Sequence, residues 1–307
     1  MNGKMLTRQF LDFIDVKDVS DDYASQRRIY EALDMAAAIF CRETRTLHDD
    51  DYLTTVVGVQ RYDLPPDFID LWMKSSKGSF FIRYTDGINY SFPPLTPYER
   101  IYRDNLTTAQ EIPNRFAIMD KGTATAAITG SATAAGAVVN SKSILTDSTR
   151  NFLTTHRAYP RDVVYNATTG AMGYVLSVID ATRLYTALFD GTAGNNGWAV
   201  SDMYTIQPSA EKELILDAPS ATAGHVMHVS YVCMPTPVFS DFDTWSFPPR
   251  TCRAIASGGA AIFKMDKTQY IESKALGGHF VDEITRFKIE QGRQKLQEVP
   301  SRRRERM

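Results

Sequence analysis

Cysteine is scarce in this sequence, and no pair of cysteines has the spacing of a metal or redox centre. Three cysteines, Cys41, Cys233 and Cys252, lie far apart among 307 residues, and no C-x-x-C pair occurs. Zinc sites and dithiol redox centres use closely spaced cysteines. We therefore expect free, buried thiols in a reducing compartment, without metal or redox chemistry.

Long apolar runs and enzyme signatures are also missing. No stretch of about 18 consecutive apolar residues exists, so the sequence predicts no transmembrane helix. The N-terminal MNGKMLTRQF lacks the apolar core of a signal peptide. A P-loop, a dinucleotide glycine fingerprint, an HExxH motif and a GxSxG elbow are absent. The sequence thus predicts no enzyme, no cofactor and no bound metal.

Composition and charge narrow the class of protein further. Hydrophobic residues make up 43% and charged residues 23%, as in soluble globular proteins. The length fits one large or two ordinary domains. The formal net charge is −2, although Ser301–Met307 alone holds four arginines and one glutamate. The rest of the chain is therefore mildly acidic, which argues against a general nucleic-acid binder, because such proteins normally have a basic face.

The stretch around which the chain is organised is Thr54–Met73, TTVVGVQRYDLPPDFIDLWM. Tyr62 and Leu64 alternate with polar residues, which predicts a half-buried strand. Pro65 and Pro66 end that strand because proline cannot donate to a ladder, and a second alternating segment follows. The simplest interpretation is a sheet edge with a Pro-Pro corner.

Periodic apolar stripes predict helices near both ends of the chain. Their ranges are Met5–Asp15, Asp21–Thr46 with Ser20 as N-cap, Arg250–Met265 and Thr268–Glu298. Each of the last two contains a glycine pair, and each glycine costs about 1 kcal/mol relative to alanine. The pairs are tolerable where a neighbouring helix packs closely; otherwise the helix breaks there. Between the second helix and the first strand, His48–Asp51 predicts a solvated turn, with a metal site as the alternative.

A change in composition marks a separate β module. Gly122–Ser141 is almost entirely Ala, Thr, Gly, Ser and Val, which indicates thin strands. Further short strands are predicted at Arg161–Asn166, Gly173–Val178, Arg183–Phe189 and Met203–Gln207, separated by turn residues. Strands at this spacing favour a small all-β sandwich or barrel.

The order of these elements resembles the head-to-tail adaptor (connector) proteins of short-tailed bacteriophages. The resemblance rests on a helical N-terminus, the pattern G-x-x-x-YDLP-x-DF, a short helix beginning near TPYER and a late helical pair. The matching positions are Gly58, Tyr62, Asp63, Leu64, Pro65, Asp67 and Phe68. It implies an α+β fold, with a helical bundle from both termini, a small antiparallel sheet and an inserted all-β domain. The implied boundaries are 1–125 and 208–298 for the adaptor body, 126–207 for the inserted module and 299–307 for a basic tail.

The same resemblance implies a structural role in the virion. In such adaptors, copies form a twelve-fold ring that joins the portal to the tail nozzle and continues the DNA channel. It implies synthesis in the bacterial host cytoplasm and location in the phage neck. Residues 126–207 are then free to meet a tail fibre or the capsid. The tail arginines Arg302, Arg303, Arg304 and Arg306 are implied portal contacts, with a solubilising end as the alternative.

A second hypothesis comes from the module itself. Its aromatic residues Tyr165, Tyr174, Tyr185 and Trp198 have the chemistry to stack on sugar rings. The chain is then a carbohydrate- or receptor-binding tail component acting through the inserted module. The more ordinary role for these four side chains is core or cross-strand packing.

Overall fold

The structure of the chain is a computed structural model. It describes residues 3–19, 25–72, 79–104, 108–122, 125–239, 243–244 and 247–297, the last six of these by backbone alone. Within the described residues the chain is mostly β, with 14 strands in three sheets, a curled half-barrel among them, and five α-helices. Helix accounts for 30% and strand for 31%. The predicted fold class, an α+β helical bundle with a small sheet, is therefore wrong.

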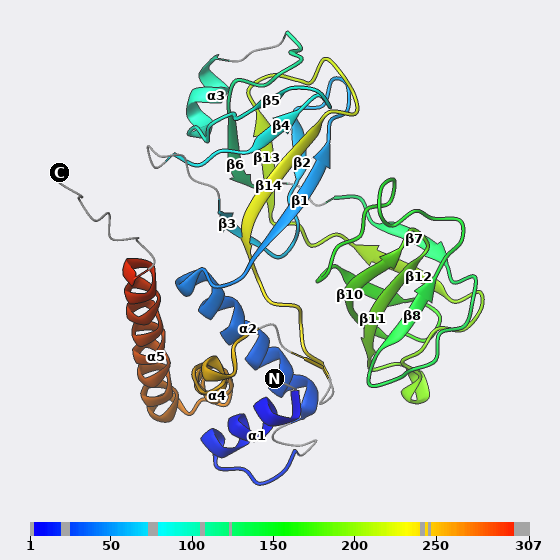
Figure 1. Cartoon of the computed structure of the whole chain (residues 1–307). Coiled ribbons are helices and arrows are strands. Elements are labelled where there is room, and N and C mark those ends of the chain that lie inside the picture. Colours follow the sequence, from blue (N-terminus) through cyan, green and yellow to red (C-terminus); the bar gives the residue numbers. More distant parts are fainter. Residues whose placement is uncertain are drawn as a thin grey trace, which may run out of the picture. The chain divides into compact units, whose positions relative to one another are not determined.

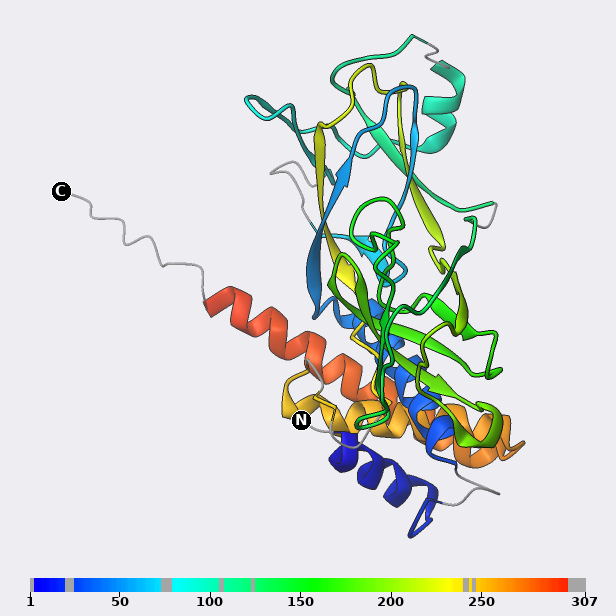
Figure 2. The ribbon, with the colours of Figure 1, turned by 90° about the vertical axis from the view of Figure 1, so that its right-hand side faces the viewer.

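The chain divides into two compact units, residues 1–46 with 241–307 and residues 47–240. The first, here called the helical unit, contains α1 (Gly3–Ile14), α2 (Gln26–Thr44), the short 3-10 helix η2 (Pro249–Thr251), α4 (Cys252–Asp266) and α5 (Tyr270–Gln297). Figure 2 shows α4 (gold) against α1 (dark blue) and α5 (orange to red), and α4 also packs on α2. Ser25 caps α2, whereas the predicted N-cap Ser20 lies outside the described residues.

The first glycine pair lets the helices of this unit approach closely. A Cβ on Gly258 would lie 3.0 Å from the ring of Phe280, and one on Gly259 would lie 3.0 Å from Leu33. Phe10 and Phe263 complete the core with an edge-to-face contact at 5.5 Å. Helix α4 is continuous through its glycines because neighbouring side chains fill the space that a side chain would need.

The second unit begins with a five-stranded antiparallel sheet (Figure 1). Its central strand β14 (Val226–Cys233) pairs along one edge with β1 (His48–Thr54). The other edge of β14 pairs with β3 (Phe68–Leu71) and β4 (Arg83–Thr85), and β4 forms a hairpin with β5 (Tyr90–Ser91). The first and last strands of the unit are thus neighbours in one sheet.

The acidic segment His48–Asp51, predicted as a turn, begins strand β1. Aspartate disfavours strands, but here Asp50 and Asp51 both find hydrogen-bonding partners, and β14 pairs with every residue of β1. Tertiary pairing overrides the local preference.

A second, three-stranded antiparallel sheet brings together strands that are far apart in the unit's sequence. It has the order β2 (Arg61–Asp63), β13 (Lys212–Leu216), β6 (Phe116–Asp120), with α3 (Tyr98–Asp104) between β5 and β6 in the chain. Strands β6 and β13 are the last strand before the inserted module and the first strand after it. The module therefore leaves and rejoins the same sheet on adjacent strands.

The inserted module contains one six-stranded antiparallel sheet (green in Figure 1). Its order is β7 (Ile128–Ser131), β12 (Met203–Gln207), β9 (Val163–Asn166), β10 (Met172–Asp180), β11 (Arg183–Phe189) and β8 (Ser143–Thr146), with the 3-10 turn η1 at Thr192–Gly194. Ala134 bridges Thr146, so the chain after β7 reaches the opposite edge strand β8. This contact protects an edge that would otherwise be open to another chain. The predicted boundaries of body, module and tail stay predictions.

The fold class was mispredicted because short strands carry little periodic signal. Strand β2 has three residues and β5 has two, too few to show a period of two. Helices of 12 to 28 residues give several turns of apolar stripe and therefore dominate a sequence-based prediction. The predicted burial of all three cysteines is confirmed.

Candidate functional site

The residues that carry the adaptor resemblance form a turn, a strand and a corner. Gly58 has φ +76°, a conformation that favours glycine. Its N–H donates to Ser220 O at 2.9 Å. The Tyr62 hydroxyl donates to Val59 O at 3.1 Å and accepts from Val56 N at 3.3 Å, which holds the same turn. Gly58 and Tyr62 thus shape the turn before β2.

The corner passes the chain from one sheet to the other. Leu64 is fully buried, and its N–H donates to Lys212 O at 3.0 Å. Pro65 O accepts from Phe68 N at 3.0 Å, and the Phe68 ring stacks on Tyr231 at 5.5 Å. Leu64 therefore belongs to the three-stranded sheet and Phe68 to the five-stranded sheet, with the prolines at the bend.

Asp67, the acidic residue of the corner, is held by the five-stranded sheet. The hydroxyl of Tyr231 donates to its Oδ1 at 3.1 Å, and its backbone O accepts from Met234 N at 2.8 Å. Burial raises the pKa of Asp67 to about 6. A half-buried carboxylate fixed by a tyrosine at a bend holds that bend in place, which is a structural role for the DF of the motif.

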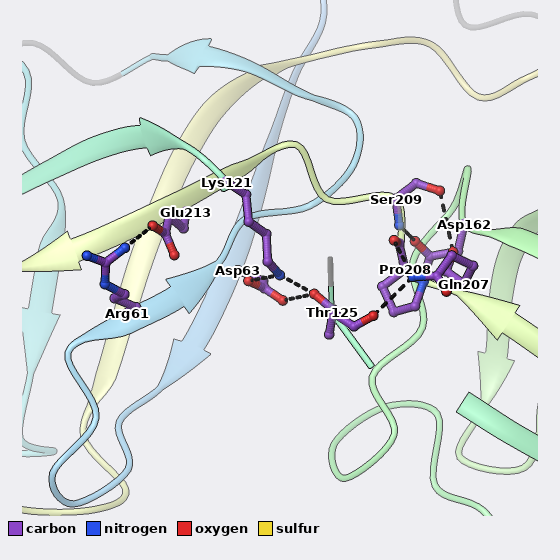
Figure 3. Close-up of polar contacts among 9 residues, drawn as sticks. All are labelled: Arg61, Asp63, Lys121, Thr125, Asp162, Gln207, Pro208, Ser209 and Glu213. Atoms are coloured by element: carbon purple, nitrogen blue, oxygen red, sulfur yellow. Dashed lines mark hydrogen bonds and ion pairs between the residues drawn. The ribbon is translucent and has the colours of Figure 1, made fainter. Parts of the chain in front are cut away.

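Asp63 ties β2 to the start of the inserted module (Figure 3). Lys121 Nζ donates to Asp63 Oδ1 at 2.5 Å and Thr125 Oγ1 donates to Asp63 Oδ2 at 2.7 Å. The side-chain amide of Gln207, at the end of β12, donates to the backbone O of Thr125 at 3.0 Å. Asp63 therefore links β2 to the segment after β6, and Thr125 in that segment is joined in turn to the last strand of the module.

The return from the module is held by a second carboxylate, Asp162, visible at the right of Figure 3. It is fully buried and accepts from Ser209 N and Tyr159 N, each at 2.8 Å. Burial raises the pKa of Asp162 to about 6. On the other side of β13, Arg61 pairs with Glu213. We call this set of contacts around Asp63 and Asp162 the module junction.

A cavity of about 580 Å³ lies beside the module junction. Asp63 and Asp162 line it together with Arg157, which pairs with Asp51, and Arg150, which contacts His156 Nε2 at 2.9 Å. Each of these charged side chains has a protein partner. The cavity is thus lined by groups that hold the chain together.

A serine, a histidine and an aspartate meet on the five-stranded sheet, on the face opposite its core. His228 Nε2 lies 2.9 Å from Asp50 Oδ1 and 3.4 Å from Ser230 Oγ, and Ser230 Oγ also contacts Asp50. In a catalytic triad the carboxylate and the nucleophile lie at opposite ring nitrogens. Here both lie at Nε2, while Nδ1 is buried without a hydrogen-bond partner among the described residues. We therefore assign this cluster no catalytic role.

Two of the four module aromatic residues considered for sugar stacking are used inside the fold. Tyr174 stacks on Phe239 at 5.4 Å with an interplanar angle of 6°, and Trp198 is buried and donates from Nε1 to Thr186 Oγ1 at 2.9 Å. Tyr165 and Tyr185 are 41% and 40% exposed. Of the four, these two are the most exposed and offer the larger surface to a ligand.

An apolar groove of about 670 Å³ crosses the surface of the helical unit. Ile39, Met265 and Val281 line it and are exposed by 40%, 56% and 59%. Gly277 also lines it, and a Cβ added there would meet nothing within 4 Å. The tail residues Arg302, Arg303, Arg304 and Arg306 lie outside the described residues.

No sequence pattern predicts the module junction. Asp162 and Ser209 are 47 residues apart, and Asp63 and Lys121 are 58 apart. In the sequence, Lys121, Thr125 and Ser209 are indistinguishable from ordinary surface residues. The only available signal was the aspartate of YDLP, which the resemblance singled out without assigning it a partner.

Comparison of the chain with protein-family models and with curated proteins found no match. Among the described residues no group of three or more histidine, cysteine or acidic side chains is arranged to hold a metal. No described helix has the length and apolar character needed to cross a bilayer. What can be said about function therefore comes from the chain itself.

Proposed function

We propose that the chain is a structural virion protein of the head-to-tail adaptor type, forming a ring that joins the portal to the tail and continues the DNA channel. The observation that carries this proposal is the pairing of β6 with β13 on either side of the inserted module. Strand β13 also pairs with β2, which holds the YDLP motif. The resembled arrangement needs these distant segments in one sheet, and a module inserted there.

The module junction supports a mechanical role. Asp63 and Asp162 bind the two chain segments that connect the module to the sheet, through three hydrogen bonds of 2.5–2.8 Å from Lys121, Thr125 and Ser209. Buried polar groups that are all hydrogen-bonded favour one conformation over many. A module fixed in this way is suited to brace a tail fibre or the capsid.

The apolar groove of the helical unit supports a contact with the portal. Exposed apolar surface in a groove is typical of sites that receive a partner helix or side chain. The remaining partners in the proposal are further copies of the chain in a twelve-fold ring, the tail nozzle protein, and viral DNA that passes without sequence-specific binding. The mildly acidic composition suits a channel wall, because negative charge repels DNA and keeps it from adhering.

The test is co-sedimentation of the purified chain with the portal ring from the same phage. Val281→Arg places a charge in the groove and is expected to abolish saturable binding. Ile289→Arg is the matched control, because Ile289 is 51% exposed on the same helix but does not line the groove. A chain truncated after Val299 tests whether the arginine tail contributes.

The outcomes separate the parts of the proposal. Saturable binding lost only with Val281→Arg supports the adaptor and the groove. Binding that also weakens on truncation gives the arginine tail its role, and binding that ignores truncation makes the tail a solubilising end. If the full chain fails to bind the portal ring at all, the adaptor function is wrong.

The carbohydrate-binding alternative now rests on Tyr165 and Tyr185. They lie on β9 and β11, with β10 between them, on the outer face of the module. Binding of the full chain to a glycan array that is lost with Tyr165→Ala or Tyr185→Ala favours this alternative. Tyr174→Ala is not a useful test, because that ring packs on Phe239.

A further inference from the structure

The face of the five-stranded sheet opposite its core carries aromatic rings that the fold leaves exposed. Tyr52 on β1 is 54% exposed, Trp72 after β3 is 39% exposed and Tyr90 on β5 is 63% exposed. Large aromatic side chains grouped on one surface are typical of binding sites, because their burial by a ligand is favourable. This face shares no residue with the module junction or with the apolar groove.

Two stacked ring pairs on this face hold Trp72 and Tyr52 in one orientation. Trp72 stacks on His48 with centroids 4.8 Å apart and an interplanar angle of 9°, and Tyr52 stacks on His228 with the same values. A side chain already held in one orientation loses less entropy when a ligand binds. Each pair thus offers a pre-oriented aromatic surface.

A carboxylate lies between the two stacks. Asp50 shares the strand face of His48 and Tyr52, because residues two apart on a strand point the same way. Its Oδ1 accepts from Ser230, and its side chain remains 52% exposed. The hydrogen bond from Ser230 lowers the pKa of Asp50, so the group stays ionised and able to accept further hydrogen bonds.

The spacing and charge of the face select the class of ligand. His48 and Tyr52 are four residues apart on one strand, about 13 Å at roughly 3.3 Å per residue. A ligand that touches both stacks is therefore longer than one sugar or one base. Nucleic acid is disfavoured because the exposed carboxylate of Asp50 on this face repels phosphates. Pyranose rings offer apolar faces to the aromatic rings and hydroxyl groups to a carboxylate, without charge.

We propose that this face binds a neutral oligosaccharide, with Tyr52 and Trp72 as stacking surfaces and Asp50 as the acceptor for sugar hydroxyls. The site lies on the five-stranded sheet, whereas the module is inserted between β6 and β13 of the three-stranded sheet. It does not involve the module's own tyrosines. The proposal goes beyond the adaptor function and does not depend on portal binding.

The test is isothermal titration calorimetry of the full chain with cello-, malto- and chito-oligosaccharides. We expect at least one of the three to bind, and Tyr52→Ala and Trp72→Ala each to weaken that binding about tenfold, the loss expected for one aromatic contact. Asp50→Asn is expected to weaken it less. Tyr102→Ala is the matched control, since Tyr102 is 73% exposed on α3 and lies outside this face.

Circular dichroism of each variant checks that the fold is intact, which is expected for side chains so exposed. Three results of the sugar titrations overturn the proposal. These are no binding by the unaltered chain at millimolar sugar, binding that Tyr52→Ala and Trp72→Ala leave unchanged, and binding lost instead with Tyr165→Ala in the module. A dimer that Tyr52→Ala dissociates, without any sugar binding, also overturns it and makes the face a contact between copies.

Discussion

The helical unit and the inserted module fill their cores in opposite ways. In the helical unit the centre of α4 is made of small residues, with Gly258, Gly259 and Ala260 against the rings and side chains of neighbouring helices. In the module the core includes polar side chains that are almost fully buried, such as Asn166 and Asp202. The helical unit is held by the close approach of its helices. The module is held in part by hydrogen bonds between buried polar side chains such as these.

This difference has consequences for how each part tolerates change. A core built on close approach is sensitive to added volume, because little space can open without moving a helix. A core built on buried polar groups is sensitive to removed atoms, because the remaining partner loses its hydrogen bond. We therefore expect the stability of the helical unit to be most sensitive to larger side chains, and that of the module to the removal of buried polar groups.

The largest effect is expected in the helical unit for Gly259→Leu. The new side chain meets the backbone of Leu33 at 3.3 Å, and we expect a loss of about 3 kcal/mol in the free energy of unfolding. Gly277→Ala is the matched control: its Cβ meets nothing within 4 Å, so we expect a gain of about 1 kcal/mol from helix propensity. Urea unfolding followed at the helical circular dichroism band measures both. Equal effects for the two variants would contradict the close-approach account.

The next effect is expected in the module for Asn166→Ala. Asn166 Nδ2 donates to Asp202 Oδ2 at 2.9 Å, and its Oδ1 accepts from the backbone N–H of Thr168 and Thr169. Removal leaves buried groups without partners and is expected to cost about 2 kcal/mol. Thermal unfolding followed by tryptophan fluorescence checks this. Thr154→Ala, exposed in the same module, is expected to change nothing, and a similar loss there would show that the polar core is not special.

A smaller effect, of opposite sign, is expected for Asp162→Asn at the module junction. The pKa of Asp162 is raised by burial from 3.8 to about 6, so its ionised form destabilises the folded state by roughly 3 kcal/mol above that pH. Asparagine keeps only one acceptor oxygen, so either Ser209 N or Tyr159 N loses its partner in the folded state, which costs about 2 kcal/mol. We therefore expect the variant to be more stable by about 1 kcal/mol at pH 7.

The pH dependence gives the sign of the Asp162 effect independently. Because the folded pKa lies above the unfolded pKa, the cost of the charge is present above about pH 6 and disappears as pH falls toward 4. The advantage of Asp162→Asn should shrink over that window in chemical unfolding experiments at several pH values. An advantage that grows on acidification would mean that the charged carboxylate stabilises the module junction.

The smallest effect is expected for Asp120→Asn. Asp120 pairs with Lys212 at 2.6 Å where β6 and β13 meet the module, but its side chain is 88% exposed. Exposed ion pairs contribute little to stability and are screened by salt. We expect no measurable change in the unfolding midpoint at physiological salt. A clear loss would show that this pair, together with the buried carboxylates, holds the module in place.

The sequence predicted best the parts whose signals are local. Strand β11 (Arg183–Phe189) and β12 (Met203–Gln207) occupy the predicted ranges, and the apolar stripe through Ile29, Leu33 and Phe40 identified α2. Strand β1 was missed, because its aspartates argue against a strand and only pairing with β14 reveals it. The number of sheets was also out of reach, since it depends on which distant strands pair.

The site was less predictable than the fold, for the same reason. Tyr62 and Leu64 were identified as a half-buried strand, and the resemblance singled out Asp63. The partners of Asp63 come from residues 121 and 125, and Asp162 binds the backbone of Ser209, which has no sequence signature. Side-chain to backbone contacts across 50 residues leave no periodic pattern, so only a three-dimensional structure reveals them.

The pairing of β1 with β14 also means that β1 is synthesised well before the strand with which it pairs. Ser230, which binds Asp50, follows it by 180 residues, and a ribosome adds roughly 5–20 residues per second. Strand β1 therefore emerges on the order of ten seconds or more before its partner, while the strands of the module lie close together in sequence and can pair among themselves. During that interval an unpaired β1 is exposed to the β1 of neighbouring nascent chains. Its three consecutive aspartates repel an identical strand, so the acidic run that conceals β1 from sequence analysis also protects it from aggregation until β14 arrives.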